Sequence, residues 1–423
     1  MTCFNRRALI GCVAGTVLAA TGLSVSAQDN EITITHYFTG ELGLKALNEQ
    51  IARFEEASGY VMRNSPVGHE DFKTDILVRA SGNSLPDVFS YWAGARVQFV
   101  VDSGSLAPID DMWDREGLDD VVAKSIADSA TLYDGTRYLV PFNYHYAVMF
   151  YNTQVFADAG ITNLPSTWDE FLEVAETLKN AGVTPIALGS KNRWPAQFWF
   201  DYLLLGTAGP DYRAALMNGT ASYDDDEVAR AMAKWKDLVD RGYFAPNANA
   251  DTWTDASDKV HRGDAAMTLM GTWITGYWND IGSVPGDDYA FFPFPVIDDS
   301  VPISVVGPVD GFVVSAHGNN PEGGKAFLAF MMSDTDVQLA WTNAVGAVSA
   351  NVNVDPANYN DVTQSVIATI GASDNFAFNY DLATPPPVAE VGLSMFAEFM
   401  DDPSRVDAIL DQAAADAASA FTQ

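Results

Sequence analysis

Apolar and polar positions in the first part of the chain switch between two periods. Residues 31–37 (EITITHY) alternate with a period of two and are rich in β-branched side chains, which predicts a strand. Residues 42–58 carry apolar side chains at helical spacing, and Gly59 supplies a typical stop after the helix. The next predicted elements are a strand over 60–65, a helix over 71–81 and a strand over 87–91. This order is typical of an α/β protein with a parallel sheet.

The rest of the chain continues this alternation, with no repeat of fixed period and no long linker. Residues 146–151 (YAVMFY) predict a strand. Residues 165–170 (PSTWDE) indicate a helix start, because a serine or threonine hydroxyl can cap the helix and acids favour its first turn. Residues 385–387 (PPP) predict a rigid, extended connector. The other predicted helices cover 152–159, 194–205, 226–241, 321–332, 389–400 and 405–421, and the other strands cover 185–188, 265–270, 301–306 and 311–315.

The N-terminal segment has the composition of a secretory signal peptide. Arg6 and Arg7 precede an apolar stretch of small residues that ends in VSA at 25–27, before a polar restart. The pattern predicts export to the periplasm with cleavage after Ala27. A retained anchor, a lipoprotein box at Cys12 and a twin-arginine signal are the alternatives. The absence of a stop-transfer pattern and the short apolar run before Cys12 favour cleavage after Ala27.

Both cysteines, Cys3 and Cys12, lie within this segment. Cleavage would leave 396 residues (423 minus 27) with no disulfide, no thiolate nucleophile and no cysteine-ligated metal. Single hydrophobic cores stop growing at roughly 250–300 residues, so a chain of this length predicts two cores. No other apolar run approaches the roughly 20 residues of a membrane span.

The formal net charge is −33, from 56 acidic and 23 basic residues, and the acids are spread along the chain. A field of this sign repels nucleic acid and anionic membrane surfaces, so neither is predicted as a partner. The charge favours solubility and is compatible with a salty habitat. The hydrophobic share of 48% is that of a globular chain.

The sequence lacks the common catalytic motifs. It contains no G-x-S-x-G, H-E-x-x-H, P-loop or G-x-G-x-x-G pattern, and the acidic clusters at 224–226 and 298–299 lack the glycine and final glutamate of an EF-hand. The histidines form no i, i+4 pair and are predicted to be ordinary surface or core residues: His36, His69, His145, His261 and His317. We therefore predict no cofactor, no metal and no enzymatic activity.

Ten tryptophans give the strongest positive signal. Sugars present C–H faces that pack on aromatic rings, and hydroxyls that need polar partners. Trp168 and Trp235 fall on predicted helix faces and are predicted to be core. Trp92 and Trp273 each follow a predicted strand, where ligand sites of α/β sheets lie. Other tryptophans at the ends of predicted elements are Trp194, Trp253, Trp278 and Trp341.

Two loops at strand ends strengthen this interpretation. Residues 38–41 (FTGE) and 91–94 (YWAG) each combine aromatic surface with small residues that admit close approach and a polar group. Both follow predicted strands of the first α/β segment. They are the first candidates for a carbohydrate-binding site.

Several short motifs, in this order, resemble the extracellular solute-binding proteins of family 1, which serve sugar ABC importers and include the maltodextrin-binding protein. The resemblance covers essentially all of the mature chain, and the shared order of the motifs carries it more than any single one. The motifs are LPDVF with YW at 85–92, GSLAPI at 104–109, VPF at 140–142 with MFYN at 149–152, LPSTWDEF at 164–171, GDAAM at 263–267 and TPP at 384–386.

The resemblance implies a type II periplasmic-binding-protein-like α/β fold. Two lobes, each with a mixed, mostly parallel sheet flanked by helices, would enclose a ligand cleft and close on a hinge. The implied signal peptide is 1–27, lobe one is 28–141 plus 307–344, and lobe two is 142–306 plus 345–423. The crossings at 141–143 and 307–311 would form the hinge, which suits Gly307 and Gly311.

Carried over to this sequence, the resemblance also implies a ligand site. Trp92 and Trp273 would sandwich a pyranose, and polar side chains would bind its hydroxyls. The implied ligand-binding residues are Phe38, Glu41, Tyr91, Trp92, Asn143, Tyr144, Arg193, Trp194, Gly271, Thr272, Trp273, Asp310, Gly311 and Asp381.

The ligand is expected to be a mono- to trisaccharide of α-glucoside type, delivered by a monomer to the subunits of an ABC permease. The absence of a cationic cluster argues against phosphorylated or uronic sugars. The alternative ligands are a polyol, a glucosylglycerol-like osmolyte, a glycerophosphodiester, a polyamine, a peptide and iron. A glycoside hydrolase would need two carboxylates about 5–10 Å apart across the scissile bond, which sequence cannot exclude among so many acids.

Overall fold

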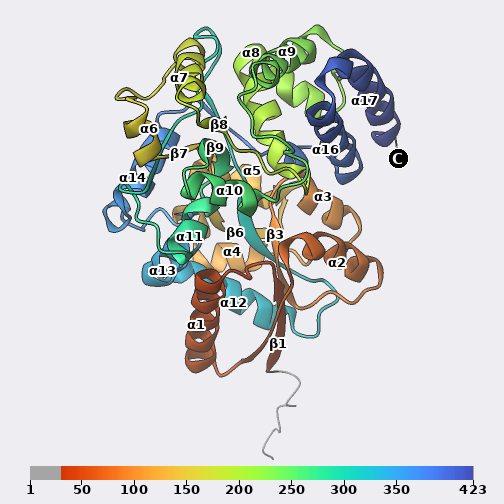
Figure 1. Ribbon diagram of the computed structural model, residues 1–423. Coiled ribbons are helices and arrows are strands. Elements are labelled where there is room, and N and C mark those ends of the chain that lie inside the picture. The colour runs from red at the N-terminus through yellow and green to blue at the C-terminus, as the bar shows by residue number, and fades with distance from the viewer. Residues whose placement is uncertain (1–29, 423) are drawn as a thin grey trace, which may run out of the picture.

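The computed structural model describes residues 30–422. The predicted signal peptide, its cleavage point after Ala27 and both cysteines lie outside these residues. Within them, no helix is both long enough and apolar enough to cross a membrane. The chain forms two main β-sheets with helices packed around them (Figure 1).

The larger sheet has six strands. They are β1 (Glu31–His36), β2 (Val61–Pro66), β3 (Val88–Trp92), β6 (Leu139–Tyr144), β12 (Val309–Val314) and β13 (Val348–Ser349). Their order across the sheet is β13-β6-β12-β3-β1-β2, so segments from three distant parts of the chain lie side by side. The predicted strands 31–37, 60–65 and 87–91 correspond to β1, β2 and β3 and are confirmed.

The smaller main sheet has four strands, in the order β10-β7-β9-β8. The bounds are β7 (Ala147–Asn152), β8 (Thr184–Ile186), β9 (Ala265–Gly271) and β10 (Tyr289–Phe292). Two further pairs stand apart from both sheets: β4 (Leu132–Tyr133) with β5 (Thr136–Arg137), and β11 (Ser304–Val306) with β14 (Asn375–Ala377). The predicted strand 301–306 is therefore shorter than expected and pairs with β14.

The strand pairing corrects one part of the expected sheet description. Both main sheets are mixed, as predicted, but they are not mostly parallel. The parallel neighbours are β1–β2, β1–β3 and β8–β9, whereas β3–β12, β12–β6, β6–β13, β10–β7 and β7–β9 run antiparallel. The antiparallel pairs arise because strands returning from the second half of the chain insert into a sheet that local strand–helix–strand units began.

Helices cover both sheets. The α-helices are α1 (Glu41–Ser58), α2 (His69–Ser81), α3 (Ala95–Asp102), α4 (Asp110–Glu116), α5 (Lys124–Thr131), α6 (Thr153–Asp158), α7 (Trp168–Asn180), α8 (Gln197–Met217), α9 (Asp226–Asp240), α10 (Trp253–His261), α11 (Trp273–Asp280), α12 (Pro321–Ser333), α13 (Thr335–Val345), α14 (Asp361–Gly371), α15 (Tyr380–Ala383), α16 (Pro386–Asp401) and α17 (Val406–Ala420). Short 3₁₀ turns are η1 (Leu118–Asp120), η2 (Trp194–Ala196), η3 (Pro356–Asn358) and η4 (Pro403–Arg405).

Local signals place several helix ends. Gly59 follows α1 with φ 77°, a left-handed conformation that glycine adopts without steric cost. Thr167 and Glu170 form a capping box at the start of α7, in which each side chain binds the backbone N–H of the other residue. The expected helix starts and stops at these positions are confirmed.

The proline run is not the extended connector that the sequence predicts. Pro385 is the N-cap of α16, and Pro386 and Pro387 form its first turn. The first turn of a helix uses no backbone N–H as an intrahelical donor, and proline already has a helical φ. The run therefore starts a helix.

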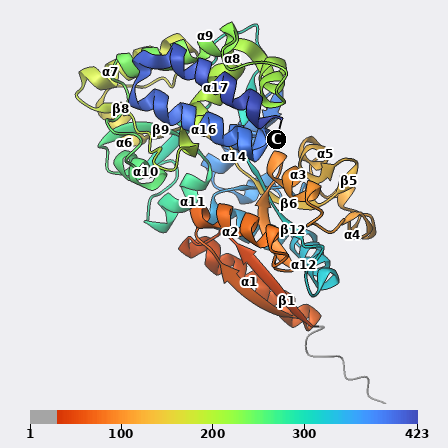
Figure 2. The same ribbon diagram turned by 90° about the vertical axis from the view of Figure 1, so that its right-hand side faces the viewer.

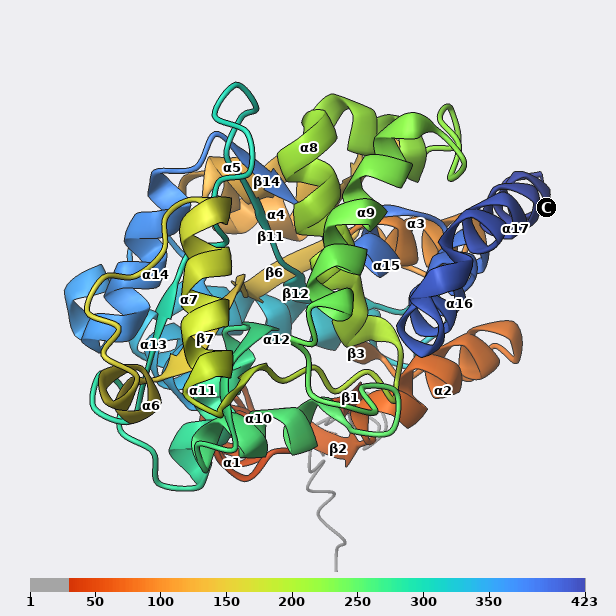
Figure 3. The same cartoon turned by 45° about the horizontal axis from the view of Figure 1, so that its top comes forward.

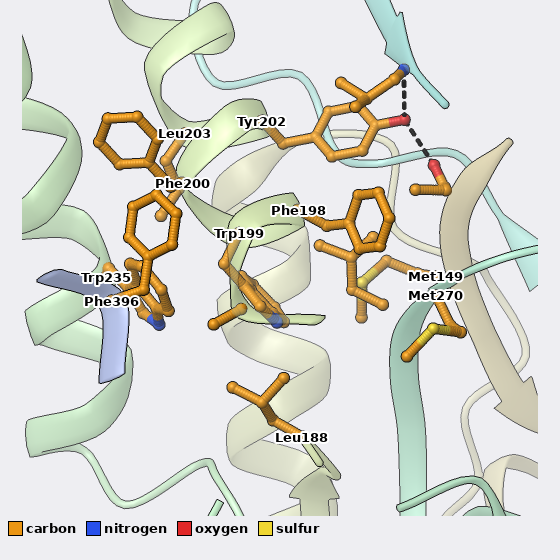
Figure 4. Packing of buried hydrophobic residues seen from close by; sticks show 14 of the residues in the cluster. Met149, Leu188, Phe198, Trp199, Phe200, Tyr202, Leu203, Trp235, Met270 and Phe396 are labelled. Carbon is orange, nitrogen blue, oxygen red and sulfur yellow. Dashed lines mark hydrogen bonds between the residues drawn. The ribbon is translucent and has the colours of Figure 1, made fainter. Parts of the chain in front are cut away.

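The hydrophobic residues divide into two clusters. One joins the six-stranded sheet with α1, α2 and α12, and the other joins the four-stranded sheet with α7, α8 and α9. Figures 1 and 2 show these groups one above the other, with α16 and α17 packed beside α8 and α9. In the second cluster Trp199 and Trp235 are fully buried near Phe396 (Figure 4). The prediction that Trp168 and Trp235 are core residues is confirmed.

Candidate ligand-binding site

A cavity of about 290 Å³ lies between the two sheets. Its walls come from the ends of β1 and β3, from the starts of α1, α2, α3 and α11, and from the chain crossings at His145 and Pro308. Segments near residues 345 and 380 complete it. In Figure 3, α1, α10 and α11 lie close together and α2 lies to their right. The volume lies close to the lower end of the roughly 300–1,000 Å³ that is usual for small-molecule sites.

Aromatic rings form much of the cavity wall. Tyr37 stacks on Trp92 with ring centroids 4.4 Å apart and 14° between the planes, so one face of Trp92 is already covered. Trp273 instead meets its aromatic neighbours at steep or tilted angles, including Trp194 at 5.8 Å and Phe198 at 5.9 Å. No parallel ring covers Trp273 among the described residues, which makes its face the better platform for a ligand.

Gly271 is required by the position of Trp273. A Cβ atom built on Gly271 would lie 2.0 Å from Cζ3 of the Trp273 ring, far closer than any real contact. The indole therefore rests against the backbone at the end of β9. This fixes the ring at the start of α11, where it faces the cavity.

Asp310 is the centre of a buried polar cluster. It lies opposite Asn143 on β6 and Trp92 on β3, and directly opposed residues of antiparallel strands share one face. Asp310 Oδ1 accepts a hydrogen bond from the Tyr37 hydroxyl at 2.5 Å, and Oδ2 accepts one from Asn143 Nδ2 at 2.7 Å. His145 Nε2 lies 3.2 Å from Oδ2. The strand register thus assembles this part of the site.

A second layer of contacts holds the Asp310 cluster in place. Trp341 Nε1 donates to Asn143 Oδ1 at 2.8 Å, and His145 Nδ1 lies 2.9 Å from Thr272 Oγ1. Burial, and then the charge and hydrogen bond of Asp310, raise the pKa of Tyr37 well above its usual value. The Tyr37 hydroxyl therefore stays protonated and remains a donor to Asp310.

Arg96 and Asp381 form a buried ion pair at another wall of the cavity. Arg96 Nη2 lies 3.2 Å from Asp381 Oδ2, and the side chains are only 7% and 6% exposed. Burial lowers the pKa of Arg96, but Asp381, together with Tyr91 and Glu390, outweighs it and the net shift is upward. Asn379 Nδ2 donates to Asp381 Oδ1 at 2.6 Å, and the Asp381 N–H donates to Gln197 Oε1 at 2.8 Å.

A buried ion pair outside the cavity anchors the segment that carries Asn379 and Asp381. Arg213 Nε donates to Asp201 Oδ1 at 2.8 Å. Arg213 Nη2 also donates to the Phe378 carbonyl at 2.6 Å, and Asp201 Oδ2 accepts from the Tyr380 N–H at 2.8 Å. Two residues of α8 therefore bind the backbone on both sides of Asn379.

Glu70 and Trp194 meet at the α2 side of the cavity. Trp194 Nε1 donates to Glu70 Oε1 at 3.0 Å, and His69 Nδ1 lies 2.9 Å from the same oxygen. Lys73 Nζ lies 3.3 Å from Glu70 Oε2 and 5.7 Å from the centroid of the Trp194 ring. This contact joins α2 to η2, which precedes α8.

The cavity brings together some of the predicted site residues. The predicted residues that line the cavity are Phe38, Trp92, Trp194, Trp273, Asp310 and Asp381. Tyr37 and several charged residues, which were not predicted, line it with them. Asn143, Gly271 and Thr272 support lining residues from behind, by the contacts described above. Trp92, Trp194 and Trp273 thus lie in the cavity wall, and their expected contacts with a sugar stay a prediction.

Besides Asn143, Gly271 and Thr272, five further predicted residues do not line the cavity. Glu41 is exposed on the first turn of α1, where its charge favours the helix N-terminus. Tyr91 points to the opposite face of β3 from Trp92, because strand side chains alternate. Arg193 bonds outward to Glu390 and Ser394 on α16. Gly311 packs against Leu139, which a Cβ would approach to 2.3 Å, and Tyr144 lies partly buried at the end of β6.

Sequence reasoning missed other lining residues. Two of the histidines expected to be ordinary, His69 and His145, line the cavity, and so do Lys73, Arg96 and Gln197. Trp253 and Tyr277 form an edge-to-face pair at 5.4 Å on the α10–α11 side. None of these residues stands in a spacing that signals chemistry, because helices far apart in the chain bring them together. Only Trp253, as a tryptophan beginning a helix, carried a usable hint.

The arrangement is suited to holding a molecule that has both apolar and hydrogen-bonding faces. Aromatic rings offer flat apolar surface, and the Asp310 and Arg96–Asp381 groups offer acceptors and donors beside it. Within residues 30–422, no three His, Cys, Asp or Glu side chains are grouped closely enough to hold a metal ion.

Comparison with known proteins identifies the family to which the chain belongs. Residues 40–338 match the family model described as bacterial extracellular solute-binding protein. An uncharacterised ABC transporter extracellular-binding protein of Pyrococcus horikoshii is 29% identical, with 86% of this chain and 81% of that protein covered. A probable sugar-binding periplasmic protein of Mesorhizobium japonicum is 26% identical, with 93% of this chain and 94% of that protein covered.

A solved structure agrees with the fold. The bacterial solute receptor AcbH, described as having an exclusive preference for β-D-galactopyranose, superimposes with a TM-score of 0.86 at 25% identity, covering 93% of this chain and 100% of that one. The expected type II periplasmic-binding-protein-like fold is confirmed. Since the family match spans more than half of the sequence, the chain is a binding protein rather than an enzyme, and it belongs to the bacterial extracellular solute-binding protein family.

Proposed function

We propose that the chain captures a carbohydrate in the cavity between its two sheets and delivers it to the permease of an ABC importer. The observation that carries this proposal is that the partly buried Trp273 ring, on which no other described ring stacks in parallel, lines the same cavity as the buried carboxylates of Asp310 and Asp381. A sugar ring has apolar C–H faces and a polar rim of hydroxyls. Stacking on Trp273 would leave that rim within reach of the polar walls.

The charges of the cavity favour a neutral ligand. Arg96 is paired with Asp381 and Lys73 with Glu70, so the cationic side chains already have anionic partners. A phosphorylated or strongly cationic ligand would have to displace one of these pairs and leave its partner buried alone, which is costly. Ligand hydroxyl groups can instead form hydrogen bonds with the donor and acceptor positions that these ion pairs leave unused.

We further propose that lobe one comprises 28–141 plus 307–344 and lobe two 142–306 plus 345–423, with hinges at 141–143 and 307–311. The division of the hydrophobic residues into two clusters supports this. Gly307 also supports it, since a Cβ there would lie 1.9 Å from the His145 carbonyl oxygen. The two crossing segments touch at that point. Ligand contacts made only in the closed form would shift the open–closed equilibrium.

Periplasmic location, action as a monomer and docking of the closed form on a permease complete the proposal. They rest on the predicted signal peptide and on the transporter-related names of the relatives. The ligand class proposed from sequence is a mono- to trisaccharide of α-glucoside type. The reported preference of AcbH for a single pyranose supports the lower end of that size range.

The test is a thermal-shift screen of residues 28–423 against sugars, polyols, amino acids and polyamines, followed by calorimetry. A ligand at about a hundredfold excess over Kd stabilises the native state by about 2.7 kcal/mol. We expect a shift with a small set of sugars. Trp273→Ala should abolish it, whereas Phe99→Ala, which removes an exposed ring, should not. Stabilisation by a polyamine or amino acid and by no sugar would overturn the proposed ligand class.

A further inference from the structure

Helix α8 is bent in its middle, and the bend brings two distant residues of the helix together. Gly209 has φ 82° and ψ 168°, a backbone conformation essentially confined to glycine, and Pro210 follows it. Asp201 lies before the bend and Arg213 lies 12 positions later, after it. In a straight helix that separation is about 18 Å along the axis. The 2.8 Å bond from Arg213 Nε to Asp201 Oδ1 therefore depends on the bend.

The two residues joined across the bend also bind the backbone of another segment. The Arg213 and Asp201 side chains are 6% and 0% exposed, so their polar atoms need partners within the protein. Arg213 Nη2 donates to the Phe378 carbonyl at 2.6 Å, and the Tyr380 N–H donates to Asp201 Oδ2 at 2.8 Å. The ion pair thus holds a backbone carbonyl and a backbone N–H that lie on either side of residue 379.

The side chains of this segment face in two directions. Asn379 and Asp381 line the cavity, whereas Tyr380 between them is fully buried in the hydrophobic cluster around α8. Gln197, the first residue of α8, accepts a hydrogen bond from the Asp381 N–H at 2.8 Å. Helix α8 therefore binds three backbone groups next to the two side chains that line the cavity.

The exact position of Asp381 matters because its carboxylate has two partners at the cavity wall. One oxygen accepts a hydrogen bond from Asn379 Nδ2 at 2.6 Å, and the other lies 3.2 Å from Arg96 Nη2. Hydrogen bonds are lost when donor and acceptor are about 3.6 Å apart, and a binding group must stay within about 0.5 Å of its productive place. A small shift of the segment would therefore disturb the whole polar wall.

We propose, resting on the proposed function, that the bent helix α8 positions the polar wall of the cavity for its ligand. Asp201 and Arg213, brought together by the bend at Gly209, are positioning residues: they fix Asn379 and Asp381 without lining the cavity themselves. Sugar affinity therefore depends on an ion pair that lies outside the site.

The experiment disturbs the bend and measures sugar affinity. Gly209→Ala strains the backbone at the bend without a steric clash, because the atom nearest to the new Cβ is Val301 Cγ1 at 3.7 Å. Calorimetry on residues 28–423 compares this variant with the wild type, using D-glucose, D-galactose, D-xylose and maltose. We expect the affinity for each sugar that binds to fall by about tenfold, which corresponds to the loss of about one hydrogen bond to the ligand.

Arg213→Lys is a second, milder variant. Lysine keeps the positive charge beside Asp201, but it lacks the planar fork with which Arg213 donates to Asp201 and to the Phe378 carbonyl together. Burial raises the pKa of Asp201 to about 6 against the opposing effect of Arg213, so both variants are measured at about pH 8, where this carboxylate is ionised. We expect a severalfold fall in affinity. If urea denaturation shows that Gly209→Ala does not fold, Arg213→Lys carries the test.

A double-variant comparison separates positioning from general destabilisation. Asn379→Ala removes a lining side chain and should weaken sugar binding in the wild type. The same change should cost little further affinity when Gly209→Ala or Arg213→Lys is present, because Asn379 is then already displaced. Losses that simply add would show that α8 does not act through this segment, and would overturn the inference.

Gly242→Ala is the matched control. Gly242 also has a positive φ, 68°, no atom lies within 4 Å of a Cβ built there, and the residue does not line the cavity. This variant should bind sugar as the wild type does. Wild-type affinity in folded Gly209→Ala and Arg213→Lys, or an equal loss in Gly242→Ala, would overturn the inference while leaving sugar binding intact. Failure of the wild type to bind any of the four sugars would overturn the proposed function, and this inference with it.

Discussion

Arg96 and Asp381 lie 285 positions apart in the sequence and 3.2 Å apart in the folded chain. One belongs to α3, which follows the first sheet strands, and the other to α15, which precedes the C-terminal helices. Their pairing links the first α/β segment to the C-terminal part of the chain at the wall of the cavity. Both side chains are nearly inaccessible to water, so the charged form of each is stabilised by the opposite charge of the other.

Removal of one partner of this pair should be strongly destabilising. Asp381→Asn leaves the Arg96 guanidinium buried without a full counter-charge, and breaking a buried pair in this way typically costs about 3–5 kcal/mol. Urea denaturation with and without sugar measures the effect. The double variant Asp381→Asn/Arg96→Gln should lose less than the sum of the single variants. Additive losses would show that the two side chains do not interact.

Asp310 is expected to organise the centre of the site. Asp310→Ala leaves the Tyr37 hydroxyl and the Asn143 amide without their acceptor, and each orphaned buried donor costs about 1–3 kcal/mol. We expect a fall of that order in the free energy of unfolding and loss of ligand binding. Asp310→Asn keeps one oxygen acceptor and should retain more stability. Equal stability of Asp310→Ala and the wild type would contradict the assigned hydrogen bonds.

Gly271 allows a sharp test of the position of Trp273. Gly271→Ala places a methyl group where the indole lies, so the ring must move away from the cavity wall. We expect sugar affinity to fall by about tenfold or more, with overpacking of about 1–3 kcal/mol in stability. Gly371→Ala is the control, since a Cβ there meets nothing within 4 Å. Unchanged binding by Gly271→Ala would remove Trp273 from the proposed site.

His36 should make the loop beside the cavity sensitive to acid. The Phe38 N–H donates to His36 Nδ1 at 3.2 Å, which leaves the ring proton on Nε2 to donate to Asn64 Oδ1 at 2.8 Å. Burial lowers the pKa of His36 from 6.5 to about 4, a shift that the bond to Asn64 only partly offsets. The neutral ring is the form that the folded chain requires.

The sign of the pH effect follows from this shift. Between pH 6.5 and 4 the unfolded chain binds a proton at His36 that the folded chain does not, so stability falls as the pH is lowered. The loss should approach about 3 kcal/mol. Urea denaturation of the wild type and of His36→Asn across this range measures it. If both lose stability in parallel, His36 is not the group responsible.

The net charge of −33 should make stability depend on salt. Like charges repel in the compact state, and the Debye length shrinks from about 10 Å at 0.1 M salt to about 3 Å at 1 M. We expect the melting temperature to rise over that range, by the same amount in NaCl and KCl. A melting temperature that does not change with salt would contradict adaptation of this chain to a salty habitat.

The sequence predicts much of the fold because most of its elements carry local signals. Residues 42–58 have a helical period and a glycine stop, and residues 165–170 carry the hydroxyl and acids of the helix start that Thr167 and Glu170 cap in α7. The order of strands inside the sheets could not be predicted in this way. Insertion of β12 between β3 and β6 depends on packing between segments about two hundred residues apart.

Part of the candidate site was predictable from a residue at the end of a strand, as Trp92 is at the end of β3, whereas Asp310, the second residue of β12, was expected only from the family resemblance. The site was not predictable where helices supply the side chains, as they do for Lys73 and Arg96, because no sequence spacing links those helices. Glu41 shows the opposite failure: it is adjacent to the correct loop, but the first helical turn directs its side chain to solvent.

The anchoring of residues 378–381 by Asp201 and Arg213 has a consequence for how this chain becomes functional during synthesis. The cavity needs Tyr37 from the start of the described chain and Asp381 from near its end. A ribosome must therefore complete nearly the whole polypeptide before any binding surface exists. A premature stop codon ahead of position 378 should yield a product with no partial affinity, and not a weakened version of the full-length protein.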